Sequence, residues 1–304
     1  MKKSILVLTD LTDNATHAAE AAVILATQIG CNVMLLYCNN TISAISYYSN
    51  ISVADESLTS YEHAKNKLKT LSDLLKQIAT EKLRDHAQPV IKSLIREGEL
   101  LSNIQKVLSE SRVELIAMGA KSGTPTDHFL FGSDTKIVVD HSTLPVLIVP
   151  PAIKLNAFIH LTFASNLMEQ DINALSYLSS LRQKLSAKLE ILHIKSYGEP
   201  TRSPYSSAKK YIEEICAKKP DLIYYKQVYG KKIPSRISSY CRESNTDLLV
   251  LSHQHHSYLF RTFRDGVVDQ FLSQHRLPLL IIPKMKIERK SNAKNYSGLS
   301  NIVF

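Results

Sequence analysis

Short apolar runs alternate along the chain with longer segments in which apolar residues recur every three or four positions. Residues 5–8 form an apolar run bounded by polar residues, which is typical of a strand buried on both faces. The segment up to Ile29 then predicts an amphipathic helix, with Thr12, Asp13 and Asn14 as its N-terminal caps and Gly30 just past its end. The first half continues in the same way, with strands at 33–37, 90–95, 115–118 and 146–149 and helices at 62–84, 101–108 and 134–141.

The chain also repeats itself at a fixed distance. Glu114–Met118 matches Asp247–Leu251, and Pro145–Pro150 matches Pro278–Pro283, in both cases 133 positions later. Two matches at one offset indicate an internal repeat. Earlier strands match at an offset of 156 positions, so the first copy carries about 23 additional residues, which fall in segment 39–61.

Strands that alternate with helices predict an α/β fold with parallel sheets and right-handed crossovers. The repeat divides this fold into two tandem Rossmann-like domains at 1–151 and 152–285, each with a five-stranded parallel sheet flanked by helices. Residues 286–304 are polar and predict a C-terminal tail. Ligands of such sheets bind beyond the carboxyl ends of the strands, where the strand order reverses.

Composition indicates a soluble globular protein, with 44% hydrophobic and 21% charged residues in a chain of 304. No apolar run reaches the roughly 18 residues needed to span a membrane. The N-terminal apolar run stops at Thr9 and Asp10, too early for a signal peptide. The four cysteines show no paired spacing, so we expect reduced thiols and a cytoplasmic protein.

The net charge of +9 is unevenly distributed. Residues 1–150 carry 14 Lys and Arg against 16 Asp and Glu, whereas residues 151–304 carry 23 against 12. A basic half is compatible with an anionic partner such as nucleic acid or a membrane surface. The sequence favours a Lys-rich solvated surface instead, because it has no Arg-rich helix and no basic stripe interleaved with aromatic residues.

A run of small residues, Gly119–Gly123, follows the fourth predicted strand, and Gly132–Ser133 opens the next helix. Glycine lets an anion approach the backbone, and unpaired N–H groups at a helix start can point at it. Asp10 and Cys38 also follow strand ends, so the fold should bring them to the same edge of the sheet. These positions predict a phosphate-binding site in the first domain.

This loop, Gly119-x2-Ser122-x9-Gly132-Ser133, resembles the Gly-x2-Gly-x9-Gly-Ser/Thr motif of ATP-binding universal stress proteins. Asp10 matches the aspartate that follows the first strand in that family. Together with the tandem repeat, these motifs make the chain similar to the two-domain form of the universal stress protein family. The resemblance implies domains of the adenine nucleotide alpha hydrolase-like type.

The resemblance also implies that the first domain binds ATP or a related adenine nucleotide, with Mg²⁺ as its companion ion. A carboxylate repels phosphate, so Asp10 is expected at the nucleoside end, while Cys38 and Met118 would form an apolar wall for the base. Lys121 would add positive charge near a phosphate. The expected nucleotide-binding residues are Thr9, Asp10, Cys38, Met118, Gly119, Lys121, Ser122, Gly132, Ser133, Asp134 and Thr135.

Some positions depart from the family pattern. Ser122 replaces a glycine, which costs roughly 1 kcal/mol if that position needs a positive φ. In the second copy Asn166 replaces the strand-one aspartate, His255 fills a glycine position and Asp265 would repel phosphate, so we expect no ATP there. The run His253–His256 has no cysteine or acidic cluster near it in sequence, so no metal site is expected.

The resemblance implies a non-enzymatic, cytoplasmic stress-response protein whose domains pack as a pseudo-dimer, with the strands at 146–149 and 279–282 close together. Homodimerisation of whole chains is compatible with this interpretation. We expect no catalytic residues, because the chain has neither a G-x-S-x-G elbow nor a G-x-x-x-x-G-K-[ST] loop. Two alternatives are an interaction scaffold that binds no nucleotide and a slow ATPase. Release of ATP from denatured purified protein would separate nucleotide binding from the scaffold.

Overall fold

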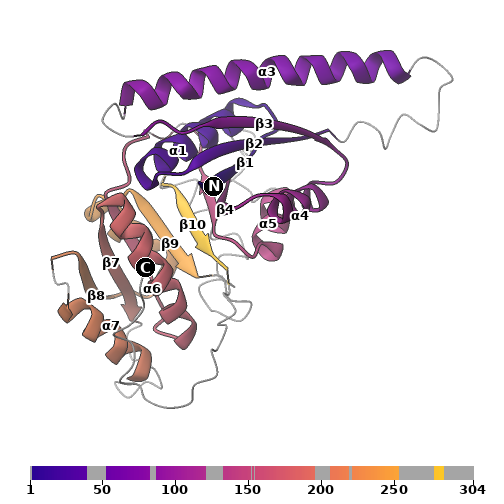
Figure 1. Cartoon of the computed structure of the whole chain (residues 1–304). Coiled ribbons are helices and arrows are strands. Elements are labelled where there is room, and N and C mark those ends of the chain that lie inside the picture. The colour runs from indigo at the N-terminus through magenta and orange to yellow at the C-terminus, as the bar shows by residue number, and fades with distance from the viewer. Residues whose placement is uncertain are drawn as a thin grey trace.

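The computed structural model describes residues 2–39, 53–82, 87–120, 133–151, 153, 155–195, 206–218, 221–252 and 277–283. Its helices are α1 (Asp13–Ile29), α3 (Val53–Lys82), α4 (Leu100–Glu110), α5 (Ser133–His141), α6 (Glu169–Leu185), α7 (Ser206–Lys218) and α8 (Ile233–Glu243). Its strands are β1 (Ser4–Leu8), β2 (Asn32–Asn39), β3 (Ile91–Glu97), β4 (Val113–Gly119), β5 (Val146–Val149), β6 (His160–Ala164), β7 (Lys188–Lys195), β8 (Ile223–Tyr229), β9 (Leu248–Ser252) and β10 (Leu279–Ile282) (Figure 1).

The described strands form one ten-stranded sheet with the order β3-β2-β1-β4-β5-β10-β9-β6-β7-β8. Neighbouring strands are parallel except at the centre, where β5 and β10 pair antiparallel with Leu147 opposite Leu280. The expected proximity of the two fifth strands is therefore confirmed. Outward from this pair, the strands follow the order β5-β4-β1-β2-β3 on one side and the equivalent order β10-β9-β6-β7-β8 on the other. In each half the strand order reverses once, between β1 and β4 and between β6 and β9.

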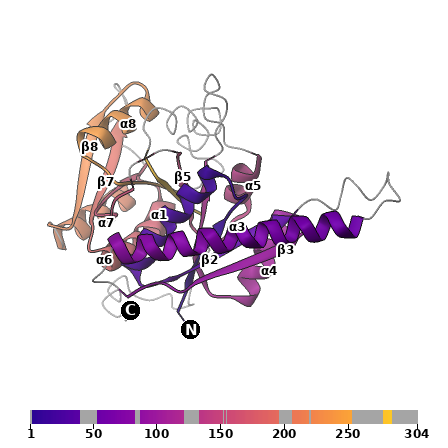
Figure 2. The ribbon, with the colours of Figure 1, turned by 90° about the horizontal axis from the view of Figure 1, so that it is seen from above.

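Helices cover both faces of the sheet and enclose two apolar cores (Figures 1 and 2). On one face α1, α3, α6 and α7 bury side chains such as Leu25, Leu68 and Leu178. On the other face α4, α5 and α8 bury side chains such as Ile104 and Ile237. Each core contains residues of both halves, so the halves pack against each other as well as pairing strands. Among the described residues, no helix combines the length and the apolar character that a membrane crossing needs.

Of the three residues predicted as N-terminal caps of α1, Thr12 is the cap, and the Gly30 cap is confirmed. Helix α3 is longer than predicted. The Thr12 hydroxyl accepts a hydrogen bond from the Ala15 N–H at 3.3 Å, and Gly30 ends α1 with a φ of 71°. Helix α3 begins at Val53 rather than at residue 62, so part of the segment inserted at 39–61 is helical. Apolar periodicity did not reveal this extension, because the buried positions among its described side chains begin only at Ala64.

The same turn follows the first strand of each half. Leu11 and Leu167, 156 positions apart, both have a left-handed backbone, with φ of 64° and 60°. In each turn the leucine N–H donates to the hydroxyl two residues earlier, at 3.1 Å to Thr9 and 3.0 Å to Ser165. A left-handed leucine costs about 1 kcal/mol or more. Because both halves keep a leucine in this unfavourable conformation, we infer that the turn is required at the point where the strand order of each half reverses.

Glu114 joins the two halves at the amino end of the sheet. Its carboxylate lies 2.6 Å from Lys3 Nζ and 3.0 Å from Lys184 Nζ of α6, and the side chain is 7% exposed. Burial alone would raise the pKa of Glu114, but the two ammonium groups outweigh burial and lower it. The carboxylate is therefore held in its charged form between the halves.

Because the pKa of Glu114 is lower in the folded chain than in the unfolded chain, its stabilising contribution is present at neutral pH and lost as the acid range is entered. We expect Glu114→Gln to lower the free energy of unfolding at pH 7 by about 1 kcal/mol, with a smaller loss at low pH. Urea denaturation across a pH series measures this. Glu62→Gln, which alters an exposed pair with Lys65, is the control; parallel pH curves for wild type and Glu114→Gln would contradict the prediction.

Candidate functional site

The predicted nucleotide site lies at the carboxyl edge of the first half, where the strand order reverses between β1 and β4. Thr9 and Asp10 directly follow β1, Cys38 lies near the end of β2, and Gly119 is the last residue of β4. The parallel register of the three strands places these ends at one edge. The convergence expected from the sequence is confirmed, and nucleotide binding by these residues stays a prediction.

Asp10 contributes to the start of α1. Its Oδ1 accepts hydrogen bonds from the Thr12 N–H at 3.1 Å and from the Thr12 hydroxyl at 2.6 Å. The side chain is otherwise exposed at the sheet edge. Since both of these bonds use Oδ1, Asp10 can hold the cap of α1 and still present Oδ2 to a donor on a ligand.

Gly119 lets the end of β4 approach the first turn of α1. A Cβ at Gly119 would lie 3.0 Å from the backbone O of Asn14 and 3.2 Å from its carbonyl carbon. The Asn14 side-chain amide in turn donates to the carbonyl of Ala120. Sequence reasoning considered Asn14 only as a cap for α1. Its contacts set the point at which the chain leaves the sheet toward the glycine-containing loop.

Cys38 and Met118 lie on the face of the sheet that α4 and α5 cover. Met118 is buried in that core, whereas Cys38 is half-buried at its margin. Burial raises the pKa of the Cys38 thiol, although a hydrogen bond with Asn103 opposes the rise. The thiol is therefore neutral near pH 7, and both side chains have the apolar character expected of a wall for a base.

Helix α5 supplies the other side of the predicted site. It begins at Ser133, and its first turn contains the exposed Asp134 and the buried Thr135. An acidic residue in a first turn complements the positive end of the helix dipole. The remaining predicted contacts lie outside the described residues: Lys121, Ser122 and Gly132.

Asp171 occupies the corresponding reversal point of the second half, between β6 and β9. It is fully buried, and it accepts hydrogen bonds from the hydroxyls of Ser165 at 2.7 Å and Ser252 at 2.6 Å. Desolvation raises the pKa of Asp171 in spite of these bonds. The sequence analysis did not identify Asp171. The repeat contains a signal for it, because polar Asp171 and Ser252 stand at the positions that Ala15 and Gly119 occupy in the first half.

Metal ligands do not gather in the part of the chain that the structure describes, where no group of three or more His, Cys, Asp or Glu could hold an ion. The histidine-containing segment of the second half, His253–His256, and Asp265 lie outside the described residues. The four cysteines are free thiols, as expected: Cys31, Cys38, Cys216 and Cys241.

Comparison with known proteins relates the first half to a family. Residues 1–150 match the universal stress protein family. No curated protein sequence matches the chain. A universal stress protein from Archaeoglobus fulgidus DSM 4304 has a similar structure, with a TM-score of 0.70 and 17% identity over 92% of this chain and 98% of that one. A putative universal stress protein from Pseudomonas aeruginosa UCBPP-PA14 has a TM-score of 0.54 and 13% identity over 93% of both chains.

The fold also occurs outside stress proteins. The cytoplasmic domain of a prokaryotic cation chloride cotransporter has a TM-score of 0.51 and 11% identity, over 92% of this chain and 95% of that one. At these identities the likeness shows the fold alone, and function has to be argued from the site. The sequence match over residues 1–150, with the Rossmann-type fold that it shares with solved stress proteins, identifies the first half as a universal stress protein domain.

Proposed function

We propose that the chain is a tandem, cytoplasmic universal stress protein whose first half binds ATP or a related adenine nucleotide and catalyses no reaction. The observation that carries this proposal is the gathering of Asp10, Cys38 and Gly119 at the carboxyl edge of the sheet, where the strand order reverses. Parallel sheets of this type bind ligands at that point. The family match over residues 1–150 supports a nucleotide as the ligand.

The described residues suit the two ends of a nucleotide differently. Asp10 Oδ2 would accept a hydrogen bond from the ribose or the adenine, beside the neutral thiol of Cys38. Phosphates would lie toward Gly119 and the N-terminus of α5, where Mg²⁺ would offset their charge. Lys121, Ser122 and Gly132 would complete the loop around them.

We further propose that residues 152–285 form a second domain that has lost the nucleotide site. The strand order and the left-handed turn repeat those of the first half, which supports a tandem origin. At its reversal point, however, the buried carboxyl group of Asp171 ties the ends of β6 and β9 to the first turn of α6. A carboxyl group in that position fills space and disfavours phosphate. The antiparallel pairing of β5 with β10 supports a pseudo-dimer of these two domains within one chain.

Titration of nucleotide-stripped protein with ATP and Mg²⁺ should therefore give one binding site per chain. Asp10→Ala should weaken binding about 10- to 150-fold, because it removes a hydrogen bond to a charged acceptor, worth about 1.5–3 kcal/mol. Asp13→Ala, which removes the neighbouring first-turn carboxylate of α1, is the matched control and should change the affinity less than about twofold. Isothermal calorimetry measures both quantities; a stoichiometry of two, or no binding by the wild type, would contradict the proposal.

A nucleotide-free interaction scaffold is the second candidate, and one observation favours it. Asp10 already caps α1 through Thr12, so a structural role accounts for this residue without a ligand. In a scaffold, Asp10→Ala would lower stability, and denatured wild-type protein would release no ATP. Mass spectrometry of the supernatant after denaturation distinguishes the two functions.

A further inference from the structure

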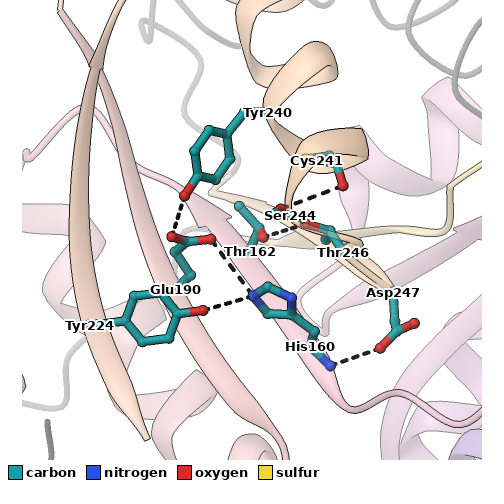
Figure 3. Close-up of polar contacts among 9 residues, drawn as sticks. All are labelled: His160, Thr162, Glu190, Tyr224, Tyr240, Cys241, Ser244, Thr246 and Asp247. Atoms are coloured by element: carbon teal, nitrogen blue, oxygen red, sulfur yellow. Dashed lines mark hydrogen bonds and ion pairs between the residues drawn. The ribbon is translucent and has the colours of Figure 1, made fainter. Parts of the chain in front are cut away.

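A second polar cluster lies at the opposite, amino edge of the sheet, beneath α8 (Figure 3). Glu190 of β7 is at its centre, with a side chain that is 3% exposed. Glu190 Oε1 accepts a hydrogen bond from the Tyr240 hydroxyl of α8. The other carboxylate oxygen, Oε2, is buried and has no hydrogen-bond partner among the described residues. A buried carboxylate oxygen without a donor is unfavourable, so this group needs an explanation.

His160, the first residue of β6, lies beside that oxygen. Its Nε2 is 3.7 Å from Glu190 Oε2 and 3.0 Å from the hydroxyl oxygen of Tyr224 on β8. The backbone around it is fixed, because the His160 N–H donates to Asp247 Oδ2 at 2.8 Å and the His160 carbonyl accepts from the Asp247 N–H at 2.9 Å. The ring itself is 18% exposed and can therefore exchange protons with solvent.

The hydrogen on His160 Nε2 decides whether Glu190 Oε2 has a donor. In the neutral tautomer that carries its hydrogen on Nδ1, Nε2 can accept the hydroxyl hydrogen of Tyr224, and it then has no hydrogen to offer Glu190. In the imidazolium ring, Nε2 carries a hydrogen and can turn it toward Oε2 over a small displacement. A charged ring would also pair with the buried carboxylate.

We propose that His160 and Glu190 form a pH-responsive tether, in which protonation of His160 gives Glu190 Oε2 its missing donor and tightens the attachment of α8 and β8 to β6 and β7. The tether connects elements that are far apart in sequence: Glu190 is held by α8 through Tyr240, and His160 by β8 through Tyr224. It also adjoins Asp247, at the turn into β9, whose carboxylate accepts from the N–H groups of both Ile159 and His160.

The carboxylates that face His160 from the surrounding elements favour the charged ring. The nearby carboxylate of Glu190 raises the pKa of His160 and outweighs the burial that lowers it, and the Asp247 charge adds to the rise. Burial raises the pKa of Tyr224 and of Tyr240, so both stay neutral. Burial also raises the pKa of the nearby Cys241 thiol, to about 12. Two cations belong to the same region: Lys188 pairs in register with His160, and Arg236 lies over the Tyr240 ring.

The direction of the pH effect follows from the raised pKa of His160. A histidine whose pKa is higher in the fold than in the unfolded chain stabilises the fold fully below the unfolded value. That contribution is lost as the pH rises through the folded value, which lies above 6.5. The tether is therefore tight at pH values below the pKa of His160 in the fold and looser above it.

An NMR titration of the full-length protein, labelled at histidine, tests the proposal. The His160 ring, assigned by its absence in His160→Gln, should titrate with a midpoint above 6.5. Glu190→Gln should lower that midpoint by about 1 pH unit or more. Hydrogen exchange of the α8 amides, corrected for intrinsic rates, should slow as the pH falls through the wild-type midpoint, and His160→Gln should abolish this dependence.

Two variants separate the tether from general destabilisation. Tyr224→Phe removes the hydroxyl that competes for Nε2 and keeps Glu190, so the midpoint should stay above 6.5. His141→Gln, at the end of α5, should leave the pH dependence of α8 exchange unchanged. A wild-type midpoint at or below 6.5, a midpoint that Glu190→Gln does not lower, or α8 exchange that does not follow the titration would each overturn the proposal.

Discussion

Replacing Gly119 by valine is expected to weaken nucleotide binding strongly and to destabilise the fold. The added Cβ would lie 3.0 Å from the backbone O of Asn14 and 3.2 Å from its carbonyl carbon. Because these atoms belong to the first turn of α1, either that turn or the end of β4 must move. Overpacking of this kind costs about 1–3 kcal/mol. The same displacement would shift Asp10 relative to Ala120, so we expect the affinity for ATP to fall about 10- to 100-fold.

The matched control for this substitution is Gly30→Ala. Gly30 ends α1 at the opposite edge of the sheet, with a φ of 71° and no atom within 4 Å of an added Cβ. Alanine there costs about 1 kcal/mol through backbone strain and should leave ATP affinity unchanged. Calorimetric titration and urea denaturation of both variants measure the two effects. Equal ATP affinity in Gly119→Val and wild type would contradict the prediction, whereas a wild type that binds no ATP would contradict the proposed function instead.

Asp171→Ala is expected to destabilise the second half by about 2–4 kcal/mol. The substitution leaves the hydroxyls of Ser165 and Ser252 and the N–H of Met168 without their acceptor. Each buried donor left unsatisfied costs about 1–3 kcal/mol, reduced where the two hydroxyls can bond to each other. Urea denaturation measures the loss, and a loss below about 1 kcal/mol would show that Asp171 does not hold the two strand ends.

Asp171→Asn separates the shape of this side chain from its charge. Burial raises the pKa of Asp171 in the folded chain above its value in the unfolded chain. The folded chain therefore holds the proton more tightly, and stability falls as the pH rises from the unfolded pKa to the folded pKa. The asparagine variant keeps the volume and lacks this pH dependence. It should therefore be less destabilised than the alanine variant, and its difference from wild type should shrink or change sign as the pH rises.

Much of the fold could be predicted from the pattern of apolar residues. The run at 146–149 coincides with β5, and the predicted helix that ends at Ile29 is α1, which is capped by Thr12 and Gly30. Burial on both faces of a parallel sheet makes each strand a continuous apolar run, which the sequence displays directly. The N-terminal part of α3 could not be predicted in this way, because its described buried positions start only at Ala64.

The candidate site was predicted only in part. Asp10 and Gly119 were found because strand ends in an α/β fold share one edge, whatever the side chains are. Asn14 and Asp171 were not assigned their roles, although both hold the point where a strand leaves the sheet. A polar residue in the first turn of a helix is ordinary in sequence, since caps and exposed turns favour the same residue types. Its partner across the sheet becomes visible only in three dimensions.

The sequence by itself determined the α/β architecture, the repeat and the edge at which a ligand would bind, because these follow from periodicity and chain order. Only the tertiary structure decided which partners the buried carboxylates meet: Glu114 meets Lys3 and Lys184, and Glu190 meets His160. Glu114 and Lys3 are 111 residues apart, so no local pattern records their contact. Hydrophobic burial is non-directional and leaves a periodic trace along the chain, whereas an ion pair depends on two particular atoms that folding brings within a few ångströms.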